Sequence, residues 1–192
     1  MVAVPSQMLA LGTLAPEFTL PDTDGRMVSL GARGAKAHLV MFICNHCPYV
    51  KHVRHELARI GREYGPRGVS IFAINSNDVL THPEDSPAAM AEEKLRTGYP
   101  FPYLVDESQQ VARAYRAACT PDFFLFDAGH RLVYRGQLDD SRPKNNKPVD
   151  GHDLRAALEA VLTARAVPEP QVPSIGCNIK WKAGQSPEWF PG

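Results

Sequence analysis

Apolar positions along the first half of the chain predict a strand–helix–strand unit. The run AHLVMFI at residues 37–43 is almost wholly apolar, which is typical of a strand buried on both faces. After Pro48, apolar residues recur at intervals of three and four, as on one face of an amphipathic helix: Val50, Val53, Leu57, Ile60 and Tyr64. A Gly-Pro pair would end that helix, and VSIFAI at 69–74 would follow as a second buried strand. Together these segments predict a βαβ unit with parallel strands.

Shorter alternating segments predict a hairpin on each side of this unit. Residues 17–20 and 27–30 flank an Asp-Gly turn signal, which favours an antiparallel pair of strands. Nearer the carboxyl end, DFFLFD at 122–127 and RLVYRG at 131–136 are expected to pair in the same way.

Three further helices are expected in the second half of the chain. A Ser-Pro pair is a favourable start for a helix over 87–97. Asp106 and Gln109 resemble a capping box that would open a helix ending at Tyr115. Residues 154–165 have helical periodicity again.

The chain is expected to form one domain followed by a tail. Residues 1–165 contain the alternating elements, and their number is sufficient for one hydrophobic core. Residues 166–192 are rich in proline and show no periodicity, yet they contain Trp181, Trp189 and Phe190. Because disordered tails are poor in aromatic residues, we expect this tail to pack on the domain.

Charge and composition narrow the possible partners and location. Lysine plus arginine number 21, as do aspartate plus glutamate, so the formal net charge is zero. The sequence therefore has no basic field for nucleic acid or an anionic membrane, and we expect neither partner. The first residues lack the basic region of a signal peptide, and no apolar run approaches the length of a membrane span. We expect a cytoplasmic protein.

The candidate chemistry lies in the segment CNHC at residues 44–47. The start of a helix presents free N–H groups and a positive partial charge, which lower a cysteine pKa from about 8.5 to between about 3.5 and 7.5. We expect Cys44, at the exposed end of the strand, to attack a disulfide and Cys47, one turn into the helix, to release the product. His46 is either an imidazolium that favours the Cys44 thiolate or an exposed side chain without influence.

Four segments in sequence order resemble thioredoxin-fold proteins of the redoxin group, the alkyl hydroperoxide reductase and thiol-specific antioxidant type. They are GTLAPEFTLPDTDGRMVSL, LVMFICNHC, TPDFFLFDAGHRLVYRG and the final helix, and they span about residues 12–165. The tail segment PSIGCNIKWKAG is similar to a cytosolic bacterial thioredoxin-like subgroup with a CNHC motif. The resemblance implies an α/β thioredoxin fold: a mixed central sheet flanked by helices, with an N-terminal β-hairpin, a helical insertion and a C-terminal tail.

The resemblance also implies a substrate groove around the cysteine pair. The Thr120–Pro121 bond is expected to be cis and to face the pair, with the Thr120 backbone available to an extended substrate. Asn45 and His46 would line the same groove. Cys119 is either a third redox thiol or a small packed residue.

One more cysteine and one polar loop are candidates for the surroundings of the site. Cys177, in the tail, is expected to be a buried packing residue that lies near Cys119 or near the pair. Asn75, Asn77 and Asp78 follow a strand at its carboxyl end, so they either border the site or form a turn.

Three functions remain open at this point. The first is a thiol–disulfide oxidoreductase, with protein or small-molecule disulfides and thiols as partners, an unidentified electron donor and no cofactor. The second is a peroxiredoxin-like peroxidase with Cys47 as its reactive thiol, because proline follows this cysteine; however, Cys44 replaces the expected threonine. The third is a non-enzymatic redox-gated binding protein or metallochaperone. A zinc site needs four ligands and the motif supplies two, so we expect no metal.

Overall fold

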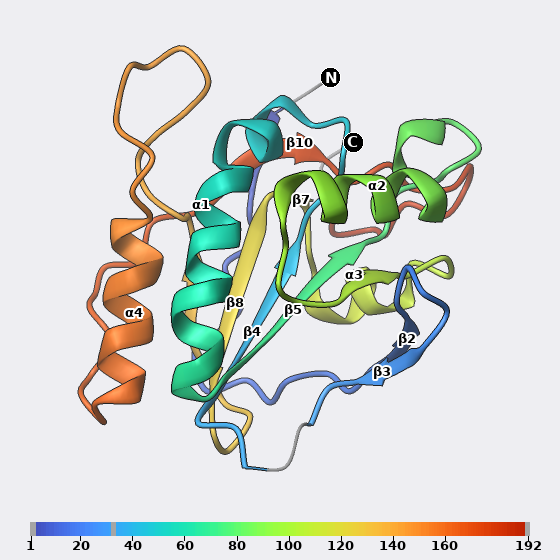
Figure 1. Ribbon diagram of the computed structural model, residues 1–192. Coiled ribbons are helices and arrows are strands. Elements are labelled where there is room, and N and C mark those ends of the chain that lie inside the picture. The colour runs from blue at the N-terminus through green and yellow to red at the C-terminus, as the bar shows by residue number, and fades with distance from the viewer. Residues whose placement is uncertain (1–2, 32–33, 191–192) are drawn as a thin grey trace.

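A mixed five-stranded sheet forms the centre of the protein (Figure 1). The computed structural model describes residues 3–31 and 34–190. The sheet has the strand order β6 (Tyr103–Val105), β5 (Val69–Asn75), β4 (Ala37–Phe42), β8 (Asp122–Asp127), β9 (Leu132–Gly136). β4 pairs parallel with β5 and antiparallel with β8, so the predicted βαβ unit and the predicted second hairpin share one sheet. The prediction of a mixed central sheet is confirmed.

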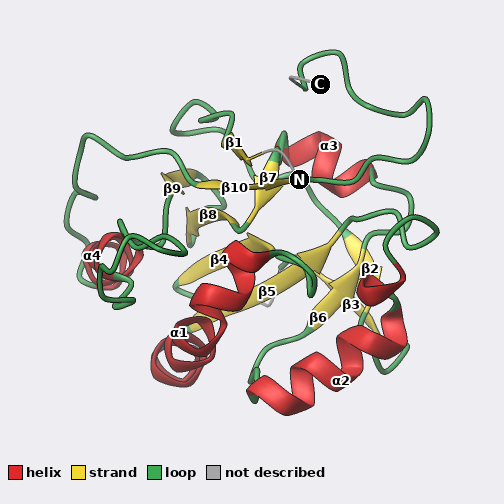
Figure 2. Cartoon of the chain, turned by 90° about the horizontal axis from the view of Figure 1, so that it is seen from above, coloured by secondary structure: helices red, strands yellow, loops and turns green. Residues whose placement is uncertain are grey.

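Helices cover both faces of this sheet (Figure 2). One face packs against α1 (Pro48–Tyr64), α2 (Pro87–Thr97) and α4 (His152–Leu162). The other packs against α3 (Gln110–Tyr115) and the amino-terminal segment that contains the hairpin of β2 (Thr19–Pro21) and β3 (Met27–Ser29). Alternate residues of β4 enter the two cores: Leu39 and Met41 on one side, Val40 and Phe42 on the other. This explains why the sequence of β4 is a continuous apolar run.

The boundaries of α1 and α2 follow the predicted signals, whereas α4 spans residues 152–162 instead of the predicted 154–165. α1 ends where the Gly-Pro pair begins a short 3-10 helix, η1 (Gly65–Arg67), and α2 begins at the predicted proline. The capping box predicted for α3 is not formed. Instead, Gln109 has a left-handed backbone (φ 61°), and the Asp106 carboxylate accepts the N–H of Ala112 at 2.9 Å. The Asp106 carboxylate therefore accepts a hydrogen bond from a backbone amide of α3, although Asp106 is not the N-cap residue of this helix.

The tail contains a strand that periodicity did not reveal. β10 (Ile175–Asn178) lies between β1 (Ala3–Pro5) and β7 (Cys119–Thr120) and pairs antiparallel with both. Farther along the tail, Trp181, Trp189 and Phe190 contact one another with ring centroids 5.9–6.3 Å apart. The carboxyl-terminal segment thus returns to the edge of β7, next to the beginning of α1 (Figure 1).

No helix within residues 3–31 and 34–190 is both long enough and apolar enough to cross a lipid bilayer.

A close backbone approach fixes β10 against β7, and this contact predicts a sensitive glycine. A Cβ atom at Gly176 would lie 2.0 Å from the Thr120 carbonyl oxygen. We expect Gly176→Ala to lower the free energy of unfolding by about 1–3 kcal/mol, because the two strands must separate to admit the methyl group. Urea unfolding followed by circular dichroism measures the change.

The matched control for this experiment is Gly65→Ala. Gly65 has a helical backbone, and no atom lies within 4 Å of the position of its Cβ. The free energy of unfolding should change by less than about 0.5 kcal/mol. Equal stability of the two variants would contradict the tight packing of β10 on β7.

Candidate active site

The two cysteines of the CNHC motif lie at the junction between β4 and α1. Cys44 follows the end of β4, and Cys47 is the N-cap residue of α1, with Pro48 as the first helical residue. Their exposed fractions are only 1% and 0%. The expectation that Cys44 is exposed and that Cys47 lies one turn inside the helix is therefore wrong. Proline is favoured at the first position of a helix because it has no N–H to leave unpaired, so Pro48 sets the start of α1 after Cys47.

Thr120, in β7, contacts the sulfur atoms of both Cys44 and Cys47. Its hydroxyl oxygen lies 3.3 Å from Cys44 Sγ, and its carbonyl oxygen accepts a hydrogen bond from the Cys47 thiol at 3.1 Å. The Thr120–Pro121 peptide bond is cis, as predicted. The backbone of Thr120 is not open to a substrate chain as expected, however, because β10 pairs with it and places Cys177 opposite Thr120.

The pairing of β10 brings a third thiol to the cysteine pair. Cys177 is 2% exposed and belongs to the same cluster of buried side chains as Cys44 and Cys47. The Cys177 and Cys47 side chains are hydrogen-bonded to each other. Cys119 lies in a separate cluster with Val4 and Ala118. Of the two additional cysteines, Cys177 and not Cys119 therefore lies in the cluster of the pair.

The surroundings of the two motif cysteines shift their pKa values in opposite directions. Burial raises the pKa of Cys44, and its hydrogen bond with Cys47 and the negative charge of Asp85 raise it further. Hydrogen bonds with Cys177 and then Cys44 lower the pKa of Cys47. Ionisation of Cys47 removes its bond to the Thr120 carbonyl, which opposes this shift, but the two thiols and the helix start favour it. Both shifts therefore favour Cys47, rather than the expected Cys44, as the thiolate of the pair.

A buried carboxylate, whose role was not predicted from the sequence, holds the turn between the two cysteines in place through hydrogen bonds. Asp85 ends the short 3-10 helix η2 (Pro83–Asp85), and its side chain is fully buried. One oxygen accepts the backbone N–H groups of Asn45 and His46, at 2.8 and 3.3 Å. The other lies 2.6 Å from His46 Nδ1 and accepts the Asn77 side-chain amide at 2.7 Å. Burial opposes ionisation, but the bonds from His46 and Asn77 hold the pKa of Asp85 below its usual value.

His46 and Asn45 are therefore placed by the η2 segment. The His46 ring is bonded to Asp85 and stacks on His82, with ring centroids 4.6 Å apart. The Asn45 side-chain amide donates to the Glu84 carbonyl at 2.9 Å. The negative charges that act on Cys44 are those of Asp85 and Cys47; they disfavour a Cys44 thiolate and so oppose the effect expected from a His46 imidazolium.

The polar loop after β5 borders the site, as one of its two interpretations predicted. Asn77 reaches Asp85, and the Asn75 side chain donates to the Asp85 carbonyl at 3.2 Å. Asp78 instead organises the turn itself, since its carboxylate accepts the backbone N–H of Leu80. A cavity of about 300 Å³ lies beside this loop and includes Asp85 in its lining.

Ligand atoms of Cys44, His46 and Asp85 lie within 4.8 Å of one another, which is compatible with a metal ion. The Asp85 oxygens and His46 Nδ1 already take part in the hydrogen bonds described above. A metal would have to replace those bonds and release the turn. The donor set is therefore better suited to fixing the CNHC turn than to coordinating a metal.

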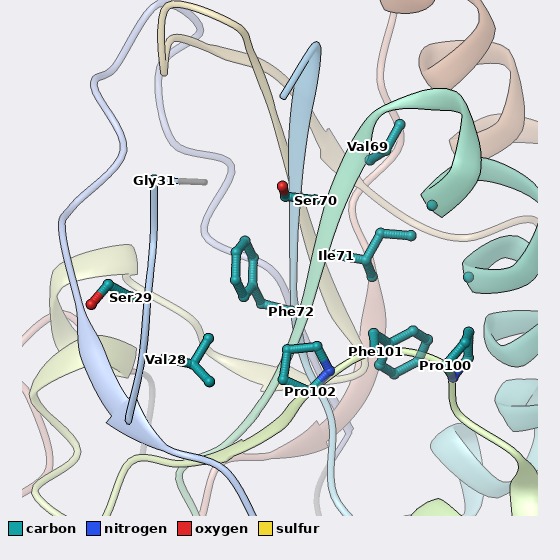
Figure 3. A pocket seen from close by; sticks show the side chains of 12 residues that line it. Val28, Ser29, Gly31, Val69, Ser70, Ile71, Phe72, Pro100, Phe101 and Pro102 are labelled. Atoms are coloured by element: carbon teal, nitrogen blue, oxygen red, sulfur yellow. The ribbon is translucent and has the colours of Figure 1, made fainter. Parts of the chain in front are cut away.

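A second cavity, of about 420 Å³, is remote from this chemistry (Figure 3). It lies at the amino end of β5, where Val69 and Phe72 form part of its wall with Pro100 and Pro102. The cysteine pair lies at the opposite, carboxyl end of the parallel strands. None of the residues that line this cavity carries an ionisable side chain, so it offers no acid–base or redox group.

The fold and the cysteine site together define a thioredoxin-fold protein. Solved structures agree with this class, including a putative thiol:disulfide interchange protein DsbE from Chlorobium tepidum. Its TM-score is 0.64 at 20% identity, with 80% of this chain and 99% of that chain covered. The AhpC/TSA family profile matches residues 11–135, more than half of the chain. The protein belongs to the AhpC/TSA family.

Two solved structures are similar over nearly the whole chain. An uncharacterized conserved protein from Geobacillus kaustophilus is 57% identical, with a TM-score of 0.93 and coverage of 96% of this chain and 98% of that one. A hypothetical protein from Sinorhizobium meliloti is 51% identical, with a TM-score of 0.92 and coverage of 94% and 99%.

Curated relatives carry a functional name. The thiol-disulfide oxidoreductase ResA of Geobacillus thermodenitrificans is 32% identical over 127 residues, which are 65% of this chain and 67% of that protein. The chain thus spans about two thirds of the length of the curated relatives that it matches.

The charge of Asp85 gives a prediction for the ionisation of Cys44. Asp85→Asn removes a negative charge that raises the pKa of Cys44, while burial, the larger cause, remains. We expect the midpoint of Cys44 ionisation to move to lower pH, and a titration of the carbon-13-labelled cysteine Cβ signals by NMR measures it. The control is Glu84→Gln, because Glu84 is exposed and only its carbonyl contacts Asn45. A Cys44 midpoint that stays in place or rises in Asp85→Asn would refute this assignment.

Proposed function

We propose that this protein is a thiol–disulfide oxidoreductase that exchanges disulfides through Cys44 and Cys47. The observation that supports this best is the contact of two buried thiols, one of them favoured as a thiolate, at a helix start beside cis-Pro121. The thiolate is the form that attacks disulfides. The name of the ResA relatives supports the same reaction class.

The direction of the pKa shifts determines the order of steps. The Cys47 thiolate attacks one sulfur of a substrate disulfide, forms a mixed disulfide and releases the other substrate sulfur as a thiolate. The Cys44 thiol lies in hydrogen-bond contact with Cys47 and attacks its sulfur next. This step forms the Cys44–Cys47 disulfide, and the Cys44 proton passes to the departing thiolate. The substrate gains two electrons, and a thiol donor must return them to the protein.

Burial of both sulfur atoms restricts the substrates. Neither Cys44 nor Cys47 is accessible in the closed arrangement, so a disulfide reaches them only when a covering segment opens. The candidate partners are protein or small-molecule disulfides and a thiol electron donor. The zero net charge provides no electrostatic preference among them.

A peroxidase that uses Cys47 is the second candidate. Its support is that Cys47 precedes Pro48 at the start of α1 and has a lowered pKa. The groups that contact the Cys47 sulfur are a carbonyl oxygen, two thiols and the backbone N–H groups of Val50 and Cys177. These groups do not supply the cationic donors that stabilise charge in a peroxide transition state. We therefore rank peroxide reduction below disulfide exchange.

Paired activity assays test this proposal. We expect Cys47→Ser to reduce the turnover of oxidised glutathione, with dithiothreitol as the electron donor, by about 100-fold or more, because it removes the attacking thiolate. Cys44→Ser should also reduce turnover, because it removes one thiol of the pair. The control is Cys119→Ala, which should retain turnover because Cys119 lies outside the cluster of the pair. Hydrogen peroxide consumption is measured on the wild type and on these three variants.

Two outcomes of these assays would reject the proposal. Full glutathione turnover in Cys47→Ser would show that the pair is not needed. Fast peroxide consumption that is retained in Cys44→Ser but lost in Cys47→Ser would instead identify a peroxidase.

A further inference from the structure

Cys47 has a thiol neighbour on each of two sides. Cys44 precedes it in the CNHC turn, while Cys177 comes from β10, more than a hundred residues away in sequence. Both neighbours are hydrogen-bonded to the Cys47 sulfur, and all three side chains belong to one buried cluster. The reaction proposed above uses Cys44 and Cys47 and leaves Cys177 without a role.

The position of Cys177 is fixed by the backbone on both edges of its strand. Cys177 is opposite Ala3 on β1 and opposite Thr120 on β7. The preceding Gly176 permits contact with the Thr120 carbonyl that any side chain would block. The hydroxyl of Ser174 donates to the Pro121 carbonyl at 2.6 Å, which fastens the chain just before the strand. β10 therefore holds the Cys177 thiol at the cysteine pair as part of its sheet register.

We propose that Cys177 is a third redox thiol of this site, which forms a disulfide with Cys47 as an alternative to the Cys44–Cys47 disulfide. This inference rests on the proposed function, because it needs a disulfide substrate that reacts at Cys47. The proposal adds a second thiol that can resolve a mixed disulfide on Cys47. It also means that the tail is linked covalently to Cys47 when the Cys47–Cys177 disulfide forms.

The reaction balances without any additional oxidant. The Cys47 thiolate attacks the substrate disulfide and leaves a mixed disulfide between Cys47 and one half of the substrate. The Cys177 sulfur then attacks Cys47 Sγ, so that the Cys47–Cys177 bond forms and the bond to the substrate breaks. The electron pair leaves on the substrate thiolate, which takes the Cys177 proton. Two protein thiols are oxidised and one substrate disulfide is reduced to two thiols.

Cys119 is not an equivalent alternative. Consecutive residues of a strand point to opposite faces, and Thr120 is the residue whose side chain faces Cys44. The Cys119 thiol instead donates to the Pro121 carbonyl at 3.6 Å and packs with Val4 and Ala118. The two cysteines of the β7–β10 pair are thus distinguishable by mutation.

The decisive variant is Cys44→Ser, which retains every residue of β10. The full-length protein is treated with oxidised glutathione, quenched with acid and mapped as proteolytic peptides without reduction. We expect a Cys47–Cys177 cross-linked peptide and the release of glutathione from Cys47. In Cys44→Ser/Cys177→Ser, the glutathione should stay on Cys47 about tenfold longer or more, because the intramolecular thiol is gone. Cys44→Ser/Cys119→Ala is the matched control and should still form the cross-link.

Other outcomes would refute either the role of Cys177 or the proposed exchange reaction. If Cys44→Ser holds glutathione on Cys47 as long as the double variant does, or if Cys47 becomes linked to Cys119, the role of Cys177 is refuted. The single variant Cys119→Ala tests the proposed function separately, since it keeps Cys177 and both motif cysteines. It should still form the Cys44–Cys47 disulfide; failure there, in a protein with an unchanged melting temperature, would reject the proposed exchange reaction. Wild-type protein equilibrated in glutathione buffer should show both cross-linked peptides, so the result does not depend on a variant alone.

Discussion

The contacts of Thr120 hold the candidate site together. Its hydroxyl oxygen lies against Cys44, its carbonyl oxygen accepts the Cys47 thiol, and its backbone pairs with the strand that carries Cys177. The cis bond to Pro121 follows immediately. Three segments far apart in sequence, the β4–α1 junction, β7 and β10, therefore meet at a single residue. A shift of β7 would disturb the contacts of both motif thiols and the pairing of the tail at once.

The surroundings of the two motif thiols favour a negative charge on Cys47 and disfavour one on Cys44. Asp85 is already a buried anion, stabilised by two backbone N–H groups, a ring nitrogen and an amide. Its charge disfavours ionisation of Cys44, whereas Cys47 is favoured by its contacts with neighbouring thiols at the start of a helix. Like charges placed close together in a site of low polarity cannot all be maintained. The same carboxylate that fixes the CNHC turn thus adds to the effect of burial and raises the pKa of Cys44 further.

The sequence predicted the elements whose burial pattern is local. β4, β5 and α1 follow from apolar runs and helical spacing, because each of these elements buries a continuous stretch or a complete face. It did not predict β10, which has four residues and depends on partners about 55 and 170 residues earlier in the chain. Asp85 resembled an ordinary loop acid, since its role arises only when η2 meets the CNHC turn. The order of the thiol pKa values differs from the expected one because Cys44 is buried and Cys47 contacts Cys177, and neither fact can be read from the local sequence.

Docking of the tail and access to the thiols are coupled through β10. A disulfide in an extended protein chain can pair with Thr120 only if β10 leaves that edge, which breaks its hydrogen bonds with β7. The aromatic cluster of Trp181, Trp189 and Phe190 opposes such an opening, because Arg113 and Arg116 of the α3 region stack on the two indole rings at 5.2 and 5.6 Å. A small disulfide requires a smaller opening and breaks fewer of these contacts. Since a local opening is populated according to its free energy, we infer that the closed tail favours small disulfides over extended protein chains.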